Sequence, residues 1–597
     1  MKTRTSISHL PFAPPSPSDK TALPPLSSRL PKTPRWSLLV LVAIVLAYVA
    51  TIVWLRPAAN FGSLQDDALY FASAKAIASG QGFLLPSFPG RLTSLKCPEL
   101  YPWLLSWVWR IHPRFPGNVA LAIALTVLFG CWFLVACWLV GRKTLGLGPV
   151  WSLLLTAFCA FNFFVLFLGG SAMSDLPFAA LVLSAALAAD RSLEPGGHWG
   201  WMALAGVLAG LATGLRTLGV SVLAGIALAV LIRRDYRRLA IFSIAGGALA
   251  LPWILPSIFH LFTTHGGATS APLGWKQTVA LYSNYLDLWR NSVPNWATQR
   301  TVFLKNLLSA VIEPGIFLLY PVASSSPILS VGLGSLLALA SWLGILYERR
   351  RKGLGSLHGI LLLYLAMILP YPFPPQRFMV LLLPLFVGGI LVTARQIAAS
   401  PTPSVRQRLP AVVSRVVLLI IAAPAAVNCA FVVPKTLART MAEQRAFLAE
   451  ERQAYRWIRQ STPPSAVFVA YNDVLLYLYT GRQAIRPIVC VTTGYYNNDP
   501  AYTLRDAAHL GDVARYVHAA YWLVSPRDFD VEVGDDQKVL VPREYALLAR
   551  FPQLFRSERS DVRIYDLRCF QNPRAAGCET GPARHSRGKL LAPASAQ

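Results

Sequence analysis

The sequence predicts an α-helical polytopic membrane protein of about 11 transmembrane helices, with a small α/β domain near its C-terminal end. Hydrophobic residues make up 54% of the 597 positions and charged residues only 14%, which is not typical of a globular protein in water. Apolar runs of about 20 residues, the length that a bilayer requires, recur up to residue 433. From residue 434 onward, mixed charges and short strand-like runs replace them.

The net charge of +27 does not indicate a nucleic-acid-binding protein. The basic residues fall in short clusters between apolar runs, which is where a membrane protein keeps its cytoplasmic anchors. We therefore expect membrane lipids, and no nucleic acid, as partners of these clusters.

The chain begins with a segment that we expect to be a disordered, basic, cytoplasmic tail. Residues 1–35 are rich in Pro, Ser, Lys and Arg and show no periodicity. They do not resemble a signal peptide, because the next run, 36–55, has full membrane length and no small-residue cleavage site.

The membrane-spanning part is expected to cover residues 36–433. After 36–55, the apolar runs predict spans at 118–140, 149–168, 175–189, 199–215, 217–232, 239–262, 327–347, 357–371, 378–394 and 411–433. With a cytoplasmic tail, the turns that return inside carry the basic clusters, namely Arg142-Lys143, Arg191, 233–238, 348–352 and 395–408. Eleven spans thus satisfy the positive-inside rule and place the C-terminus outside.

Two long outward segments and a soluble domain follow from this path. The segments are 56–117 and 263–326, and long loops in compact proteins tend to be functional. Residues 434–570 predict an extracytoplasmic α/β domain, and 571–597 a disordered tail. The strands of this domain are expected at 466–472, 519–525 and 561–567, with helical stretches at 439–460 and 499–517.

The first outward segment contains an acidic pair, Asp66 and Asp67, in a stretch with helical spacing. On a helix, Asp66 and Tyr70 share a face, whereas Asp67 points about 100° away. One carboxylate can then face a cavity while the other caps the helix. Because an acid at a helix start also favours the helix dipole, capping explains either residue equally well.

The same segment continues with Arg91, Lys96 and Glu99 before it returns to the membrane. Two basic groups near two acids at a bilayer surface are suited to holding a phosphate while a carboxylate transfers a proton. The alternative is that Arg91 and Lys96 extend to lipid headgroups.

The eight cysteines do not indicate a disulfide framework or a structural metal site. Cys131, Cys137, Cys159 and Cys429 lie inside apolar runs, where cysteine serves as a small packing residue. Cys569 and Cys578 are free to pair if the C-terminal end lies outside the cytoplasm.

Several motifs together resemble the GT-C superfamily of integral-membrane glycosyltransferases. The order is an Asp-Asp-x-x-Tyr motif at 66–70, a Lys-x-Pro-x-x-Tyr-Pro motif at 96–102, and then the stretches SAMSDLPFAALVLSAAL (171–187), AGLATGLRTLGVSVLAG (209–225) and PPQRFMVLLLPL (374–385). They are most similar to the branch of protein O-mannosyltransferases, aminoarabinose transferases and bacterial lipopolysaccharide-core transferases. The resemblance covers residues 36–433.

This resemblance implies a sugar donor carried on a polyprenyl phosphate and transfer on the outer face of a bacterial inner membrane. Asp66 matches the catalytic acid of the family, and Asp67 matches its second acidic position. Some relatives have a glutamate before the lysine of the second motif, where this chain has Leu95. A bridging divalent metal is therefore unsupported, although Glu99 could substitute, and no other cofactor is implied.

Four further residues are candidates beyond the first outward segment. Arg216 and Arg377 stand at outer ends of spans, where an isolated arginine is costly unless it is paired or near headgroups; we expect them to bind the donor phosphate, with interfacial anchoring as the alternative. Asp175, at another span entrance, is a helix cap or a substrate contact. His265 is a candidate substrate contact in the second outward segment.

Two other classes of function compete with a glycosyltransferase. A transporter or flippase of polyprenyl-linked or anionic substrates would carry ionisable residues deep in its spans, but the apolar runs here are nearly free of charge. A non-catalytic protein that binds lipid-linked sugar would share the same motifs. Protein, lipid and glycan acceptors all fit the pattern.

Overall fold

The structure is a computed structural model, and it describes most of the chain. The described residues are 33–90, 92–93, 97–263, 275–276, 278–279, 282, 285–293, 295–326, 329–399, 423–487, 496, 510–528 and 537–568. Both predicted disordered tails lie essentially outside these ranges, as do Cys569 and Cys578 and most of the predicted span 411–433.

Within the described ranges, seven helices are long and apolar enough to cross a membrane. They are α1 (Arg35–Leu55), α4 (Val119–Leu139, extended by η2, Val140–Thr144), α7 (Asp175–Leu193), α10 (Tyr236–Thr263), α13 (Trp296–Leu319), α15 (Gly334–Lys352, preceded by η4, Leu329–Leu333) and α17 (Leu383–Ala399, preceded by η5, Phe378–Leu382). Three shorter apolar helices complete the bundle, namely α8 (Trp199–Leu215), α9 (Gly219–Ile232) and α16 (Ser356–Ile368).

An eighth span is formed if two bent helices are counted together. The helices α5 (Pro149–Ala160) and α6 (Phe163–Gly169) meet at 59°. The break has a local cause, because the side chain of Asn162 accepts a hydrogen bond from the backbone N–H of Phe164 and so starts a new helix there. Its amide also donates to the carbonyl of Phe317, which anchors the bend to α13.

The predicted spans from 36–55 to 378–394 each coincide with one of these helices or with the bent pair. The count of 11 stays a prediction, and one expectation needs correction. We expected 263–326 to be an outer loop, but it contains α13, a helix of spanning length and composition. The sequence did not predict this helix, because Glu313 and Pro314 interrupt its apolar run. In the structure, Ser309 donates a hydrogen bond to the Glu313 carboxylate one turn away.

The predicted inward turns lie together at one end of the bundle. Lys352 Nζ donates to the carbonyl of Thr144 at 2.7 Å, and Arg395 donates to the carbonyl of Gly146 at 2.8 Å. The backbone N–H of Ser356 donates to Asp190 at 3.0 Å. Turns far apart in sequence therefore meet at the same end, as the charge pattern requires. We call this the basic end.

The opposite end carries the first outward segment, which forms η1 (Pro57–Asn60), α2 (Asp66–Ala78) and α3 (Leu100–Ile111). Helix α2 is buried along most of its length, with Phe71 fully covered and its carbonyl bonded to Trp109 Nε1 at 2.9 Å. Trp103 and Trp107 on α3 are exposed, an arrangement typical of a helix at a membrane surface. Two small elements, α12 (Tyr285–Ser292) and α14 (Val322–Ser325), flank α13.

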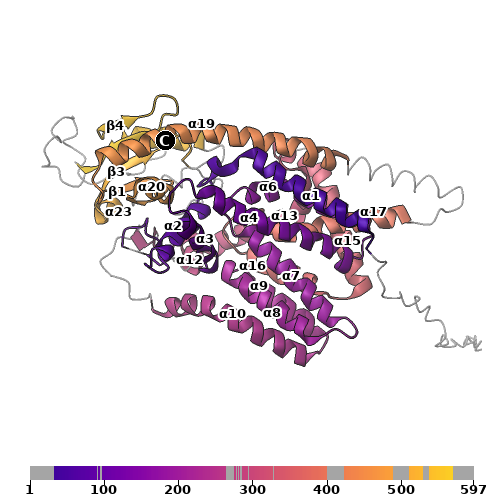
Figure 1. Cartoon of the computed structure of the whole chain (residues 1–597). Helices are drawn as coiled ribbons and strands as arrows, with labels where there is room; N and C mark the ends of the chain where they lie inside the picture. Colours follow the sequence, from indigo (N-terminus) through magenta and orange to yellow (C-terminus); the bar gives the residue numbers. More distant parts are fainter. Residues whose placement is uncertain are drawn as a thin grey trace, which may run out of the picture.

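The C-terminal part begins with η6 (Asn428–Val432) and the long helix α19 (Val433–Ser461), which runs along the bundle to a five-stranded sheet (Figure 1). The strand order is β2-β1-β3-β5-β4, with β1 parallel to β2 and β3, and β5 antiparallel to β3 and β4. The strands are β1 (Val467–Ala470), β2 (Gln483–Ile485), β3 (Ala519–Val524), β4 (Gln553–Arg556) and β5 (Arg563–Asp566). The helices described among them are α20 (Asp473–Thr480), α23 (Leu510–Tyr516) and α24 (Gln537–Leu548).

The three predicted strands are confirmed as β1, β3 and β5, the central strands of the sheet. The predicted helix 439–460 lies within α19, and of the predicted helix 499–517 only the end is described, as α23. The edge strands β2 and β4 were missed, because β2 has only three residues and β4 is largely exposed. Short edge strands lack the continuous apolar run that identifies a buried strand.

The sheet region packs on the end of the bundle that carries α2 (Figure 1). Tyr282 donates to Asp473 Oδ2 at 2.5 Å, and Lys305 Nζ donates to the carbonyl of Tyr496 at 2.7 Å. The Gln483 amide also donates to the carbonyl of Phe88 at 3.2 Å. These contacts hold the C-terminal part against the first outward segment and against the region 263–326.

Candidate active site

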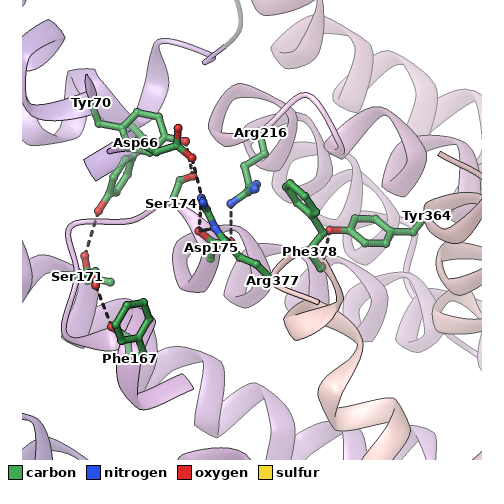
Figure 2. Close-up of polar contacts among 12 residues, drawn as sticks. Asp66, Tyr70, Phe167, Ser171, Ser174, Asp175, Arg216, Tyr364, Arg377 and Phe378 are labelled. Atoms are coloured by element: carbon green, nitrogen blue, oxygen red, sulfur yellow. Dashed lines mark hydrogen bonds and ion pairs between the residues drawn. The ribbon is translucent and has the colours of Figure 1, made fainter. Parts of the chain in front are cut away.

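Four charged side chains from four separate parts of the chain meet at the end of the bundle that carries α2 (Figure 2). Arg377, just before η5, lies at the centre of this group. Its Nη1 is 3.0 Å from Asp66 Oδ2, and its Nη2 is 3.2 Å from Asp175 Oδ2. Arg216 Nη1 completes the group at 2.6 Å from Asp175 Oδ1. We refer to these four residues as the outer charge cluster.

The two halves of the outer charge cluster differ in their access to solvent. The side chains of Asp175 and Arg216 are only 5% and 8% exposed, whereas those of Asp66 and Arg377 are 28% and 23% exposed. A buried ion pair is held in place because either charge alone would be strongly destabilised. The inner pair therefore fixes the site, and the outer pair presents the surface that a ligand can reach.

Asp66 is positioned by the backbone that leads into α2. It is the first residue of the helix and follows Gln65, whose φ of 61° turns the chain sharply. Asp67, which is fully buried, accepts hydrogen bonds from the backbone N–H groups of Gly62 and Ala68, both at 2.9 Å. Asp67 thus ties the loop to the helix start and leaves Asp66 to face Arg377.

The electrostatics of Asp67 combine two opposing effects. Burial raises the pKa of the Asp67 carboxyl to about 7, while its two backbone donors lower the pKa by favouring the charged form. Gly62 is needed for this arrangement, since its φ is +91° and a Cβ there would meet the side chain of Leu475 at 2.8 Å. The C-terminal part of the chain therefore touches the loop that Asp67 holds.

Tyr70 lies one turn beyond Asp66 and faces the same helix start. Its hydroxyl is 3.1 Å from Ser174 Oγ, next to Asp175. Its ring packs edge-to-face on Tyr101 with centroids 5.2 Å apart, and the Tyr101 hydroxyl bonds Thr126 at 3.0 Å. Asp66 is linked to the beginning of α7 through Arg377, which pairs with both Asp66 and Asp175, and Tyr70 reaches the same place through Ser174, as their predicted shared helix face requires.

Arg216 ends α8 and lies over the ring of Phe378, 5.4 Å from its centroid. The carbonyl of Phe378 accepts a hydrogen bond from Tyr364 at 2.8 Å. Phe378 therefore stabilises both guanidinium groups. Its backbone, held by Tyr364, positions the neighbouring Arg377, and its ring packs against Arg216.

Comparison with known proteins was informative only at the level of structure. No protein-family model matches the chain, and no curated protein does. Among solved structures, oligosaccharyltransferase AglB from Archaeoglobus fulgidus, in complex with an inhibitory peptide and a dolichol-phosphate, matches with a TM-score of 0.50 and 14% identity over 87% of this chain and 72% of that chain. AglB is a GT-C superfamily membrane glycosyltransferase. This chain has the GT-C fold.

ArnT from Cupriavidus metallidurans bound to undecaprenyl phosphate, another GT-C protein, matches with a TM-score of 0.47 and 14% identity. That match covers 87% of this chain and 97% of that chain. The fold resemblance expected from the motifs at 66–70 and 374–385 is confirmed by the match to AglB.

Not every predicted site residue is brought into the outer charge cluster. Arg91, Lys96 and His265 lie outside the described residues. Glu99 stands at the start of α3, half-buried, and burial raises its pKa. In the part of the chain that is described, no hydrogen bond or ion pair joins the Glu99 carboxylate to Asp66, Asp175, Arg216 or Arg377.

Sequence reasoning missed part of the site. Asp175 was open as a helix cap or a substrate contact, and the structure shows its carboxylate holding both arginines. Ser174, the partner of Tyr70, was not singled out. The sequence feature that could have indicated Ser174 is the Ser174-Asp175 pair at the start of a predicted span. Local sequence, however, does not show which distant residues such a pair contacts.

The described residues contain no group of three or more His, Cys, Asp or Glu side chains that could hold a metal ion. The partly exposed carboxylate of Asp66 and the buried carboxylate of Asp175 are instead paired with guanidinium groups. Guanidinium is suited to phosphate and carboxylate recognition, because its planar N–H groups bond two oxygens at once.

Proposed function

We propose that this protein is a membrane glycosyltransferase that moves a sugar from a polyprenyl-phosphate donor to an acceptor on the extracytoplasmic face, with Asp66 as the catalytic carboxylate. The observation that carries the proposal is the partly exposed Asp66–Arg377 ion pair at 3.0 Å. It joins a carboxylate, which can accept a proton, to a guanidinium, which can hold a phosphate. AglB, which shares the fold, was solved with a dolichol-phosphate.

Phosphate binding would replace the Asp66 carboxylate with the donor phosphate as an anion bound to Arg377. Arg377 reaches Asp66 through Nη1, but it holds Asp175 through Nε at 3.3 Å and Nη2 at 3.2 Å. A donor phosphate can therefore replace Asp66 at Nη1 while Asp175 keeps the arginine in place. Arg216, whose Nη1 lies 2.6 Å from Asp175 Oδ1, adds a second positive charge.

This exchange would also activate Asp66. A carboxylate paired with a guanidinium is stabilised in its charged form and is a weaker proton acceptor. Once the phosphate occupies Arg377, Asp66 is released to accept the proton of an acceptor hydroxyl. The hydroxyl oxygen forms a bond to the anomeric carbon, the bond from that carbon to the phosphate oxygen breaks, and polyprenyl phosphate leaves as an anion that Arg377 and Arg216 stabilise.

The remaining predicted residues have supporting roles in this proposal. Asp67 positions Asp66 through the backbone of the loop, and Tyr70 holds α2 against the start of α7. Arg91 and Lys96 stay predicted phosphate contacts, and Glu99 and His265 stay predicted substrate contacts. A second carboxylate to protonate the leaving group, as in glycoside hydrolases, is not required, because phosphate departs as an anion.

The test supplies membranes containing the protein with radiolabelled polyprenyl-phosphate sugars. Wild type should consume donor, and Asp66→Asn should be slower by about 100-fold or more, the usual contribution of a general base. Asp235→Asn, an acid in a solvent-accessible pair with Arg238, is the matched control and should retain activity. The proposal fails if wild type consumes no donor or if the Asp66→Asn variant consumes it equally well, as a flippase or a non-catalytic binder would.

The membrane side of the site is a second expectation. With the basic end in the cytoplasm, the outer charge cluster and everything after residue 434 lie outside. A reporter enzyme fused after residue 434 should be active only in the extracytoplasmic compartment. Cytoplasmic activity would place Asp66 on the wrong side of the membrane for this proposal.

A further inference from the structure

The turn that carries Arg377 is held by α13, the helix that the sequence did not predict. This turn, residues 369–377, lies between α16 and η5. Asn306 on α13 is 1% exposed, and its Nδ2 donates to the carbonyls of Leu369 at 3.1 Å and Tyr371 at 2.8 Å. Both carbonyls lie just beyond the end of α16, where carbonyls lack a partner within the helix. One side chain of α13 therefore fixes the first residues of the turn.

The oxygen of the same amide faces the C-terminal part of the chain. Asn306 Oδ1 accepts a hydrogen bond from the Tyr496 hydroxyl at 2.7 Å. Tyr496 is 2% exposed, and Lys305 donates to its carbonyl at 2.7 Å. Both amide hydrogens and the amide oxygen of Asn306 are thus bonded, to three partners in two regions far apart in sequence. This side chain has a fixed orientation, because rotation would leave buried polar groups unpaired.

The turn contacts the outer charge cluster through aromatic rings. The ring of Tyr371 packs edge-to-face on that of Phe378, with centroids 5.4 Å apart. Phe378 directly follows Arg377, and its ring packs against the guanidinium of Arg216 (Figure 2). An edge-to-face ring pair has a preferred geometry. A displacement of Tyr371 would therefore shift the ring that packs against Arg216 and the backbone that carries Arg377.

A second contact with α13 lies at the other end of the turn. The side chain of Gln376, the residue directly before Arg377, hydrogen-bonds the carboxylate of Glu313. Glu313 is 4% exposed and also accepts a hydrogen bond from Ser309 at 3.1 Å. The turn is thus tied to α13 at its first residues and again at Gln376. The direction in which Arg377 leaves the turn therefore depends on α13.

We propose that Asn306 is a positioning residue for donor binding, which couples the C-terminal part of the chain, through Tyr496, to the orientation of the Arg377 guanidinium. The inference rests on the proposed function, in which Arg377 binds the donor phosphate. A guanidinium bonds phosphate through N–H groups that lie in one plane, so the strength of binding depends on its orientation. A displacement of the turn should weaken donor binding without removing any charge from the site.

The first measurement separates donor binding from turnover, with the full chain in lipid nanodiscs. Asn306→Ala removes the donor to the carbonyls of Leu369 and Tyr371. It should raise the KM for a polyprenyl-phosphate sugar about tenfold and change kcat by less than about threefold. A merely structural role would instead reduce the active fraction, and so kcat, at an unchanged KM. Thr301→Ala is the matched control, since the Thr301 hydroxyl bonds the carbonyl of Ala297 within α13, and its KM should equal that of wild type.

The second measurement tests the coupling through Tyr496. Tyr496→Phe keeps the ring but removes the hydroxyl that reaches Asn306, and it should raise the same KM about threefold. In the Asn306→Ala background the change should have no further effect, because the partner of the hydroxyl is already absent. Effects that multiply would contradict a route through Asn306. If Asn306→Ala does not fold, Tyr496→Phe alone decides, because an unchanged KM would then exclude the coupling.

Hydrogen exchange without donor tests the coupling independently of the transferase proposal. Asn306→Ala and Tyr496→Phe should both accelerate exchange of the backbone amides in 369–380, whereas Thr301→Ala should not. A wild type that consumes no donor would contradict the transferase proposal, and faster exchange in the two variants would still support the coupling to the turn. The inference is overturned if both variants exchange at 369–380 as wild type does, or if both lower kcat or Tm and leave the KM unchanged.

Discussion

The two ends of the helix bundle each carry a buried carboxylate surrounded by cations, but the cations are held differently. At the basic end, Glu348, whose side chain is 1% exposed, lies 3.3 Å from Lys352 and 3.8 Å from Arg395. Both cations also donate to backbone carbonyls of the 144–146 turn. At the other end, every hydrogen bond that the described residues give the Arg377 side chain goes to a carboxylate, of Asp66 or of Asp175.

This difference separates a structural cluster from one suited to ligand exchange. A backbone carbonyl carries no net charge and is part of a turn, so an incoming anion cannot take its place without unfolding that turn. A carboxylate on a side chain can be replaced at a guanidinium by a phosphate, which offers the same anionic oxygens. The basic end therefore joins helices, whereas the outer charge cluster can open.

The largest expected effect is on stability, when the buried acid of each end is neutralised. Asp175→Asn leaves Arg216, only 8% exposed, without its carboxylate and should cost about 3–5 kcal/mol of unfolding free energy. Glu348→Gln should cost less, because Arg351 and Lys352 are 35% and 37% exposed and can reach water. Thermal unfolding in one detergent compares the two variants. Equal losses would contradict the distinction between the two ends.

The next effect concerns the central arginine. Arg377→Lys should raise the KM for a polyprenyl-phosphate donor by about ten- to a hundredfold, because an ammonium cannot hold Asp175 and a phosphate together with the fixed geometry of a guanidinium. Arg395→Lys is the matched change at the basic end and should leave the KM unaltered. Donor titration in the consumption assay measures both. A similar KM for Arg377→Lys and wild type would rule out phosphate binding at this residue.

A third effect is a pH dependence that comes from Asp67. Its pKa is raised from about 4 in the unfolded chain to about 7 in the fold, so the folded state binds more protons between these values. The free energy of unfolding should therefore fall as pH rises from 4 to 7, by at most about 1.4 kcal/mol per unit, and level off above 7. Asp67→Asn should remove this slope.

The measurement for Asp67 is the difference in Tm between wild type and Asp67→Asn at pH 5 and pH 8. Asp235→Asn serves as the control for general effects of removing an acid, since that residue is paired near the surface. If wild type and Asp67→Asn lose stability in parallel across this range, the carboxyl of Asp67 titrates outside it.

Sequence reasoning succeeded where one local pattern decides the outcome. The helical spacing of Asp66 and Tyr70 placed both on one face, and both are linked to the start of α7, Asp66 through Arg377 and Tyr70 through Ser174. Apolar runs located the candidate spans up to 378–394 other than α13, and β-rich runs located the central strands β1, β3 and β5. It failed for α13, where the Glu313–Pro314 pair interrupts the run, and for the short edge strands β2 and β4.

The sequence by itself determined the membrane class of the protein, the positions of its basic turns and the position of an acidic helix start outside the apolar runs. Only the tertiary structure decided which charges meet. Asp66 and Arg377 are 311 positions apart, and Asp175 and Arg377 are 202 apart. No local propensity links such residues, because their contact follows from how the helices pack against one another.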